Sequence, residues 1–244
     1  MDYSFLFSFL LLSSIFFLLS SSSLLPCFLS SFFFFFSSGT PKFLEMSHSF
    51  LKSELCAAAQ SGSVEDILSL LKDNPNLDVN CSGKDRWSAL HYASRDGHVE
   101  VVKLLLAHPA INVNQPLLDD ITPLSLGCMN DQVSVVEVLL KDPRVDVTLN
   151  DDKGCTPLWL ASCFGRQKVN ECLIASGRYL GDIENKKGKN WDDREYTALE
   201  IARKNQRSEV VSVLEKFMTN PTLTRLELGG SLECWMSWLL RSFP

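Results

Sequence analysis

The feature that most constrains this chain is that its sequence repeats itself every 34 residues. The prolines Pro75, Pro109 and Pro143 keep this interval. The same spacing separates the residues at three predicted helix starts, Ser88, Thr122 and Thr156. A shared period of this length is typical of a chain built from copies of one structural unit, each of which covers its apolar face only by stacking on its neighbours. The period therefore predicts a stack of helix pairs that folds as one entity.

Composition separates a low-complexity N-terminal segment from an ordinary soluble remainder. Residues 1–36 contain 11 Phe, 9 Leu and 10 Ser, and Asp2 is their only charge. The uncharged run from Phe5 to Phe36 exceeds the ~20 residues that span a bilayer, which fits a membrane anchor. It has neither the basic n-region nor the Ala-x-Ala site of a signal peptide, so a cleaved signal is the weaker interpretation.

A third interpretation of this segment concerns its codons. Phe, Leu and Ser share pyrimidine-only codons, so translated non-coding sequence would have this composition, with the true start at Met46. The three interpretations stay open. On each of them, residues 1–45 are expected to take no part in the packing of the repeats.

The charge of the chain bears on the kind of partner. The formal net charge is −6 with a pI near 5.3, and the basic residues are scattered along the sequence. Nucleic-acid-binding proteins instead cluster Lys and Arg on one face. The sequence therefore predicts a protein partner rather than a nucleic acid.

The cysteines bear on the compartment. The chain has 8 Cys, and none of them forms a C-x-x-C pair. Their gaps match no spacing by which four ligands converge on zinc. Free, reduced thiols are expected, which favours a reducing compartment such as the cytoplasm or nucleus.

The second unit, which begins at Ser88, carries a family resemblance. Ser88-Ala89-Leu90-His91 resembles the Thr-Pro-Leu-His motif of ankyrin repeats, and Asp96-Gly97-His98 then leads into the apolar run VEVVKLLL. The first unit, SELCAAAQSGSVEDILSLL, aligns with the second without a gap, and the third and fourth begin with Thr-Pro-Leu. The resemblance implies an all-α repeat solenoid of stacked ankyrin helix-turn-helix units with projecting β-hairpin loops.

The resemblance covers about five repeats over residues 53–220 and implies three parts. Residues 1–45 are the low-complexity segment, residues 46–220 the ankyrin repeat domain, and residues 221–244 a C-terminal tail or capping helix. The repeats are expected near residues 53–87, 88–121, 122–155, 156–196 and 197–220. The interval from Thr156 to Thr197 is seven residues longer than the period, so one hairpin is expected to be longer.

The tail contains an apolar stripe at helical spacing: Leu232, Trp235, Met236, Leu239 and Phe243. It fits a capping helix over the last repeat or, equally, a mispredicted exon. Two repeats also depart from the pattern. Asp131 replaces the turn glycine of the third, and Asn170 of the fourth stands where the second has Val102, so Asn170 needs a hydrogen-bond partner if it is buried.

Candidate catalytic residues are few. His91 lies in the helix-start motif, where a structural hydrogen bond is expected rather than catalysis. Cys163 has no histidine in its own repeat or the next, and a nucleophilic cysteine needs such a base. We therefore expect no enzymatic activity, no cofactor, no metal and no small-molecule substrate.

The resemblance also implies a partner-binding surface, because ankyrin proteins bind partners on a concave face built from hairpin tips and the exposed ends of first helices. Transferred position by position, its members are Lys84, Asp85, Trp87, Arg95, Asp96, Leu118, Asp119, Ile121, Met129, Asn130, Asp152, Lys153, Cys155, Cys163, Phe164, Asp193, Arg194, Tyr196, Lys204 and Asn205. Trp87, Ile121, Met129, Phe164 and Tyr196 are expected to form an apolar track with basic residues beside it, which is typical of binding hot spots. The alternative is that Trp87 and Tyr196 pack only on adjacent hairpins.

The resemblance thus implies a monomeric, non-enzymatic protein-interaction module or scaffold in the cytoplasm or nucleus. One alternative is a membrane-tethered ankyrin adaptor anchored by residues 5–36. The other is a regulatory fragment attached to an enzyme encoded elsewhere.

Overall fold

A computed structural model describes residues 41–80 and 86–229 of the chain. Contacts divide the chain into two compact units, residues 1–49 and 50–244, and the repeats lie in the second. Helix α3 (Pro41–Ser61) begins before the expected boundary at Met46 and provides the first helix of the first repeat. Among the described residues, no helix combines the length and the apolar character needed to cross a membrane. The run from Phe5 to Phe36 lies outside those residues.

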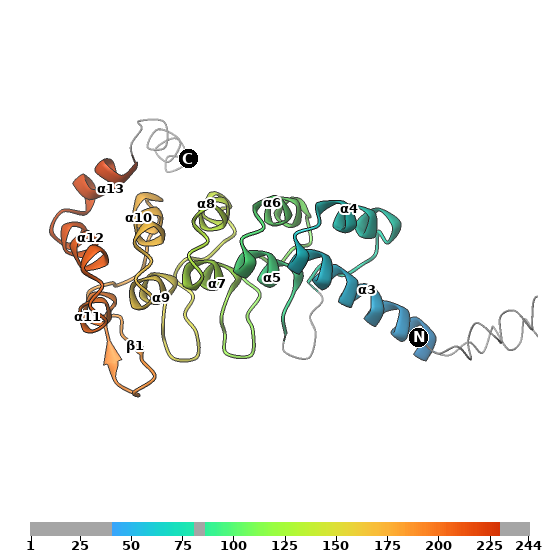
Figure 1. The fold of residues 1–244 in the computed structure, drawn as a ribbon, viewed down its shortest axis with the longest axis horizontal. Coiled ribbons are helices and arrows are strands. Elements are labelled where there is room, and N and C mark those ends of the chain that lie inside the picture. Colours follow the sequence, from blue (N-terminus) through green and yellow to red (C-terminus); the bar gives the residue numbers. More distant parts are fainter. Residues whose placement is uncertain (1–40, 81–85, 230–244) are drawn as a thin grey trace, which may run out of the picture. The chain divides into compact units, whose positions relative to one another are not determined.

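Each repeat is a pair of helices, as predicted. After α3 come α4 (Val64–Asp73), α5 (Ala89–Asp96), α6 (Val99–Ala107), α7 (Pro123–Met129), α8 (Val133–Lys141), α9 (Pro157–Cys163), α10 (Gln167–Ala175), α11 (Ala198–Lys204), α12 (Ser208–Thr219) and α13 (Pro221–Gly229). The first helices α5, α7, α9 and α11 pack side by side, and so do the second helices α4, α6, α8, α10 and α12. The repeats thus form a two-layered all-α solenoid, with loops projecting from the first-helix layer (Figure 1).

The helix starts follow from their residue types. The hydroxyls of Thr122, Thr156 and Thr197 accept hydrogen bonds from backbone amides three residues on. Pro123 and Pro157 then occupy the first helical position, where a backbone donor is not needed. The first helices of the third, fourth and fifth repeats therefore start where the sequence motif indicates.

The core consists of the apolar positions that the repeats share. Leu55 and Leu90 are fully buried in corresponding positions of the first and second repeats, and Leu105 is buried between α6 and its neighbours. Each such side chain contributes roughly 1.5–3 kcal/mol on burial. Asn170 is buried too, as the sequence allowed, and it is satisfied because it accepts from Ser162 Oγ at 2.9 Å and donates to the Arg166 carbonyl at 2.8 Å.

Side-chain contacts join neighbouring repeats next to the turn between the two helices of each repeat. His98 Nε2 lies 2.9 Å from the Gln60 carbonyl, and Gln132 Nε2 donates to the Arg95 carbonyl at 3.0 Å. Arg166 Nε donates to the Met129 carbonyl at 3.0 Å. Each of these side chains opens a second helix and reaches a carbonyl at the end of the preceding first helix. We call these three contacts the turn bonds.

The turn bonds explain why the turns of these repeats favour glycine. Gly62, Gly97 and Gly165 have positive φ, and a Cβ on any of them would collide with the side chain that crosses above it. Asp131 and Gln206 occupy the same position in the third and fifth repeats and also have positive φ, at 60° and 57°. The expected departure at Asp131 is therefore a change of residue without a change of backbone conformation.

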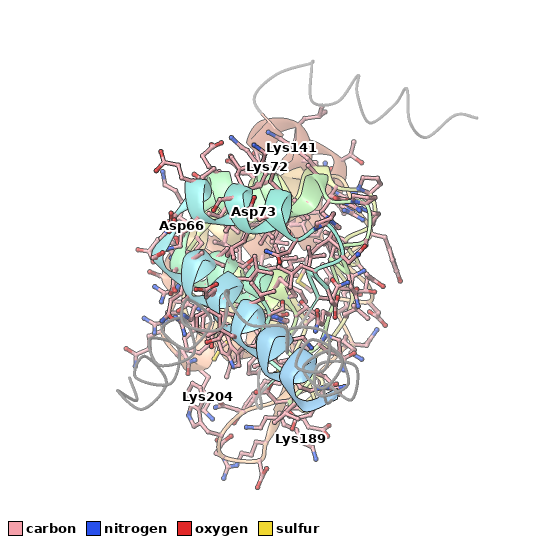
Figure 2. The ribbon with its side chains drawn as sticks, turned by 90° about the vertical axis from the view of Figure 1, so that its right-hand side faces the viewer. Asp66, Lys72, Asp73, Lys141, Lys189 and Lys204 are labelled. Atoms are coloured by element: carbon pink, nitrogen blue, oxygen red, sulfur yellow. The ribbon has the colours of Figure 1, made fainter. Side chains whose placement is uncertain are left out.

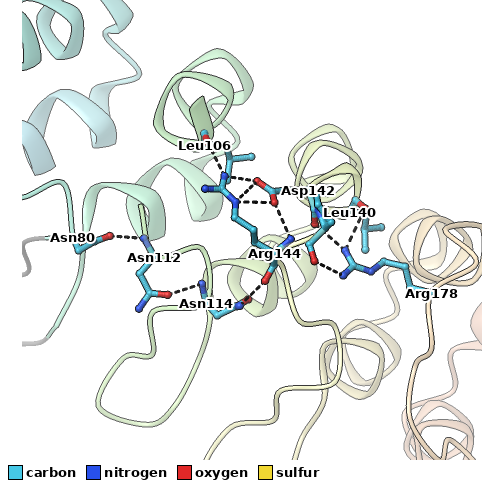
Figure 3. Close-up of polar contacts among 9 residues, drawn as sticks. Asn80, Leu106, Asn112, Asn114, Leu140, Asp142, Arg144 and Arg178 are labelled. Atoms are coloured by element: carbon cyan, nitrogen blue, oxygen red, sulfur yellow. Dashed lines mark hydrogen bonds and ion pairs between the residues drawn. The ribbon is translucent and has the colours of Figure 1, made fainter. Parts of the chain in front are cut away.

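A second series of contacts joins neighbouring repeats through the segments that follow the second helices. The Asn80 amide contacts the backbone of Ala110 and Asn112, and the Asn114 amide contacts Arg144 and Asp146 in the same way. We call these contacts the asparagine ladder. Beside it, the guanidiniums of Arg144 and Arg178 reach the Leu106 and Leu140 carbonyls at the ends of α6 and α8 (Figure 3).

The loops are turns in most repeats. Among the described residues, only the long loop before the fifth repeat contains strands, the antiparallel pair β1 (Gly188–Lys189) and β2 (Glu195–Tyr196). Loops 112–121 and 146–155 project as turns without regular strands, closed by bonds from Leu117 N to the Ile121 carbonyl at 3.0 Å and from Asp151 N to the Cys155 carbonyl at 3.1 Å. Successive loops still bond to one another, because Asp152 N donates to the Asp119 carbonyl at 3.0 Å and Lys189 N to the Lys153 carbonyl at 2.9 Å.

Helix α13 follows the fifth repeat. It begins at Pro221 after Asn220, whose side chain accepts from Leu223 N at 3.1 Å and so caps the helix. The helix packs against α10 and α12. The apolar stripe from Leu232 to Phe243 lies outside the described residues.

Candidate partner-binding surface

The predicted binding residues lie on the side of the repeats from which the loops project. We define the hairpin-side surface as the loops 112–121, 146–155 and 178–196 together with the C-terminal ends of α5, α7, α9 and α11. Figure 2 places Lys189 and Lys204 on this side, and Lys72, Asp73 and Lys141 of the second-helix layer on the opposite side. Lys84 and Asp85 lie outside the described residues.

The first part of this surface is an N-terminal cluster of Trp87, Tyr92, Arg95 and Asp96. The Trp87 and Tyr92 ring centroids are 5.0 Å apart, and the Arg95 guanidinium lies 5.1 Å from the centroid of the first ring and 5.4 Å from that of the second. Arg95 also donates to both Asp96 carboxylate oxygens, at 2.7 and 2.8 Å. This hydrogen bonding lowers the pKa of the Asp96 carboxyl below its ordinary value. The cluster is held together by its own contacts.

The middle of the surface is less apolar than expected. Ile121 and Met129 are half-buried, while Leu118, Asp119 and Asn130 are exposed. Leu118 is the most accessible apolar side chain of its loop, at 67% exposure. The predicted track is therefore not a continuous apolar strip.

The second part is a C-terminal cluster of Phe164, Trp191, Asp192, Tyr196 and Lys204. The Phe164 and Trp191 ring centroids are 6.4 Å apart with planes tilted by 56°. Lys204 Nζ lies 4.4 Å from the centroid of the Tyr196 ring, donates to its hydroxyl at 2.9 Å and pairs with Asp192. This pairing raises the pKa of Lys204 and lowers that of Asp192. The cluster joins α9, α11 and the long hairpin.

Two arginines lie beside the C-terminal cluster. The Arg207 side chain covers Gly165, the residue after Phe164, so closely that a Cβ there would lie 2.6 Å from Arg207 Cδ. Arg166, on the other side of Gly165, makes the turn bond to Met129. Lys153, Asp152, Asp193 and Arg194 are exposed on the loops, as predicted.

Two of the transferred positions are wrong as contact residues. Cys155 and Cys163 are 2% and 1% exposed, because the long hairpin covers the first and Asn205, itself half-buried, donates to the Cys163 carbonyl at 3.0 Å. Burial raises the pKa of the Cys163 thiol, which makes it a weaker nucleophile at neutral pH. Cys56, Cys128 and Cys172 are also free thiols.

Sequence reasoning missed four residues of this surface: Tyr92, Trp191, Asp192 and Arg207. Trp191 belongs to the inserted segment, where no position of another repeat corresponds to it. An available signal was a tryptophan within the charged run KNWDDRE, since a large apolar side chain is unusual at such a site.

His91 has the structural role that its motif indicates. Its Nδ1 lies 2.7 Å from Ser88 Oγ and accepts from Ser88 N at 3.2 Å, so Nε2 is the donor to the Gln115 carbonyl at 2.9 Å. Burial lowers the pKa of His91 from 6.5 to about 4. In the fourth repeat the equivalent residue is Trp159, whose Nε1 donates to the Tyr196 carbonyl at 2.7 Å.

The second-helix side also has a hollow, of about 420 Å³, between α10, α12 and α13. Glu171, Glu209, Glu227 and Lys216 line it together with apolar residues such as Leu228. The predicted site residues do not contribute to it. It is therefore separate from the hairpin-side surface.

Comparison with known proteins gives one family. The family model described as ankyrin repeats (3 copies) matches residues 55–151, which span most of the first three helix pairs. A search of curated proteins found no match. The fourth and fifth helix pairs, which lie beyond the matched residues, continue the same two-layered packing.

Proposed function

We propose that this chain, of which residues 55–151 match the ankyrin-repeat family model, is a non-enzymatic module that binds a protein partner through its hairpin-side surface. Ankyrin repeats serve as protein–protein interaction modules. The observation that carries the choice of surface is the C-terminal cluster, in which Trp191 is 72% exposed beside Phe164. Exposed aromatic side chains with cations nearby dominate the energetics of many interfaces.

The proposal extends to the compartment. Five cysteines of the described residues are free thiols, and two of them, Cys56 and Cys172, are only half-buried. Free cysteines are usual in proteins of the reducing cytoplasm and nucleus. We therefore place the module there as a monomeric scaffold with no cofactor.

A membrane-tethered adaptor is the second candidate, and the uncharged run from Phe5 to Phe36 favours it. Expression of the full chain and of a shortened chain that begins at Met46, followed by membrane fractionation, tests it. A tether requires the full chain to sediment with membranes and the shortened chain to remain in the supernatant. Equal distribution of the two chains would contradict the tether.

The binding surface is tested by isolating partners on the full chain and measuring the affinity of each purified partner for variants. A double change of Trp87→Ala and Tyr196→Ala is expected to weaken binding more than tenfold, because interface aromatics each contribute about 2 kcal/mol or more. The matched control is Lys103→Ala on α6, a residue exposed on the second-helix layer that pairs only with Glu100 of its own helix. Loss of binding with the control but not with the double change would move the site to the second-helix side.

A further inference from the structure

The two aromatic clusters of the hairpin-side surface differ in how much of their ring surface and charge a partner can reach. In the N-terminal cluster, the Arg95 guanidinium lies near both rings and donates two hydrogen bonds to Asp96. A partner would have to break these contacts before it formed its own. An anchor side chain of the partner therefore gains less from the N-terminal cluster than from a cluster whose rings are open.

The C-terminal cluster leaves its largest aromatic surface open. Trp191 is 72% exposed, and its one aromatic neighbour is the tilted ring of Phe164. Both rings are rigid and large, so a partner that covers them gains apolar burial at small entropic cost. An apolar or aromatic side chain of the partner fits this position.

The charge around the C-terminal cluster is positive, although the whole chain carries −6. The turn between α9 and α10 reads GRQK, and the turn between α11 and α12, with its flanking residues, reads RKNQRS; neither contains a carboxylate. The equivalent turns of the second and third repeats contain Asp96 and Asp131. The two basic turns touch, because Arg207 lies against Gly165.

Part of this charge is free for a partner. Lys204 is paired with Asp192 and Arg203 with Glu215, whereas among residues 41–80 and 86–229 neither Arg166 nor Arg207 forms an ion pair with a carboxylate. The adjoining hairpin is close to neutral, since Lys189 and Glu195 are opposite each other in the strand register, and Arg194 follows Asp193. In the described part of the chain, Arg166 and Arg207 are thus cations without a carboxylate partner on either side of Gly165, the residue that follows Phe164.

We infer that the partner presents an acidic linear segment with a large apolar side chain at its centre, and that this segment docks on the C-terminal cluster. The apolar side chain covers Trp191 and Phe164, and carboxylates on either side of it pair with Arg207 and Arg166. Guanidiniums bind carboxylates through two parallel hydrogen bonds, which fixes the orientation of the segment. This inference rests on the proposed function and names the class of partner.

The test is selection of random 12-residue peptides, displayed on phage, against the full chain. We expect the selected peptides to combine Asp or Glu with a central aromatic or aliphatic residue. Selection of basic peptides, or of none, would overturn the inference. For the selected peptides, binding measured by fluorescence anisotropy is expected to weaken at high salt, because the charge pairs are close to solvent.

Variants then place the peptide. Arg207→Glu and Trp191→Ala are each expected to lower the affinity for the selected peptides at least tenfold. The milder Arg207→Gln is expected to lower it less than Arg207→Glu. The matched charge reversal Lys103→Glu on α6 is expected to change the affinity less than twofold. Circular dichroism of each variant verifies that the fold is kept. Equal losses from Arg207→Glu and Lys103→Glu would overturn the inference, because they would reveal attraction by charge alone.

The same variants separate this inference from the proposed function. A partner isolated on the full chain that loses affinity with the Trp87 and Tyr196 double change but not with Arg207→Glu would keep the hairpin-side function and overturn the acidic segment. Light scattering measures the oligomeric state of the chain. A dimer that dissociates on Trp191→Ala would assign the C-terminal cluster to a second copy of this chain, and the inference would fall.

Discussion

The second repeat and the fourth repeat connect their first helix to the next loop with different side chains. In the second, His91 bridges Ser88 and the Gln115 carbonyl; in the fourth, Trp159 donates one hydrogen bond to the Tyr196 carbonyl. Both side chains are buried. In these two repeats a ring N–H thus reaches a carbonyl of the next loop from the same position, whereas the third and fifth repeats have Ser125 and Glu200 there.

The two regions also differ in how far their aromatic side chains are exposed to solvent. Trp87 and Tyr92 of the second repeat contact Arg95, which pairs with Asp96, while Trp191 beside the fourth repeat stays exposed. An aromatic residue at a loop position is thus not enough to identify a binding site. Its neighbours decide whether it is free.

The largest expected effect tests the fourth repeat. Trp159→Ala should lower the free energy of unfolding by about 3–5 kcal/mol, because it removes a buried ring and leaves the Tyr196 carbonyl without its donor. Denaturant unfolding of the full chain measures it. Trp159→Phe, which keeps most of the ring volume, should cost clearly less. A cost below about 1 kcal/mol for the alanine variant would mean that this bridge does not support the repeat.

The next effect tests the second repeat by pH. The folded pKa of His91, about 4, lies below its ordinary value of 6.5, so the unfolded chain binds the proton first as the pH falls. The contribution of His91 to stability is complete above about pH 6.5 and is lost by about pH 4, a total of roughly 3 kcal/mol. Unfolding free energies measured across this range should fall less steeply in His91→Gln, and parallel curves would contradict the assignment. Trp159 does not titrate, so the fourth repeat adds no such dependence.

A smaller effect tests the two clusters. Trp87→Ala should destabilise the fold by about 1 kcal/mol, because it removes the contacts with Tyr92 and Arg95. Trp191→Ala should change stability by less than about 0.5 kcal/mol, since the side chain is mostly exposed. Thermal unfolding of both variants measures the difference. Equal losses would remove the distinction between a closed and an open cluster.

The smallest effect concerns the turns. Gln206→Gly should raise the free energy of unfolding by about 0.5–1 kcal/mol, because φ is 57° there and a side chain is strained at such an angle. Gly97→Ala in the second repeat should have the opposite sign, since φ is 84° and Gln132 lies above it. A destabilising Gln206→Gly would show that the glutamine side chain makes contacts that outweigh the strain.

Much of the fold follows from the sequence, because the period and the capping residues are local signals. Thr122, Thr156 and Thr197 mark helix starts through a bond to their own next turn, which any helix needs. The state of the binding surface depends on contacts between residues far apart in the chain. Neither the approach of Phe164 to Trp191 nor the covering of Cys155 by the long hairpin leaves a periodic trace.

The inserted segment before the fifth repeat could not be compared with the other repeats. Within it, Trp191 and Asp192 have no counterpart in other repeats, so transfer by position could not place them. The same segment supplies two of the five residues of the C-terminal cluster. The sequence thus gives the least information about the inserted segment, where the 34-residue period breaks and where the exposed Trp191 of the C-terminal cluster lies.

The turn bonds and the asparagine ladder have a consequence for how such a gene changes length. Every donor in them reaches an acceptor one unit away, as Gln132 reaches Arg95 and Asn114 reaches Arg144. Duplication or loss of one whole unit leaves each donor facing an equivalent acceptor, so recombination in steps of 34 residues is tolerated. A single codon gained inside a helix would misplace the donors on both of its sides, whereas the seven codons gained before Thr197 were absorbed in a loop.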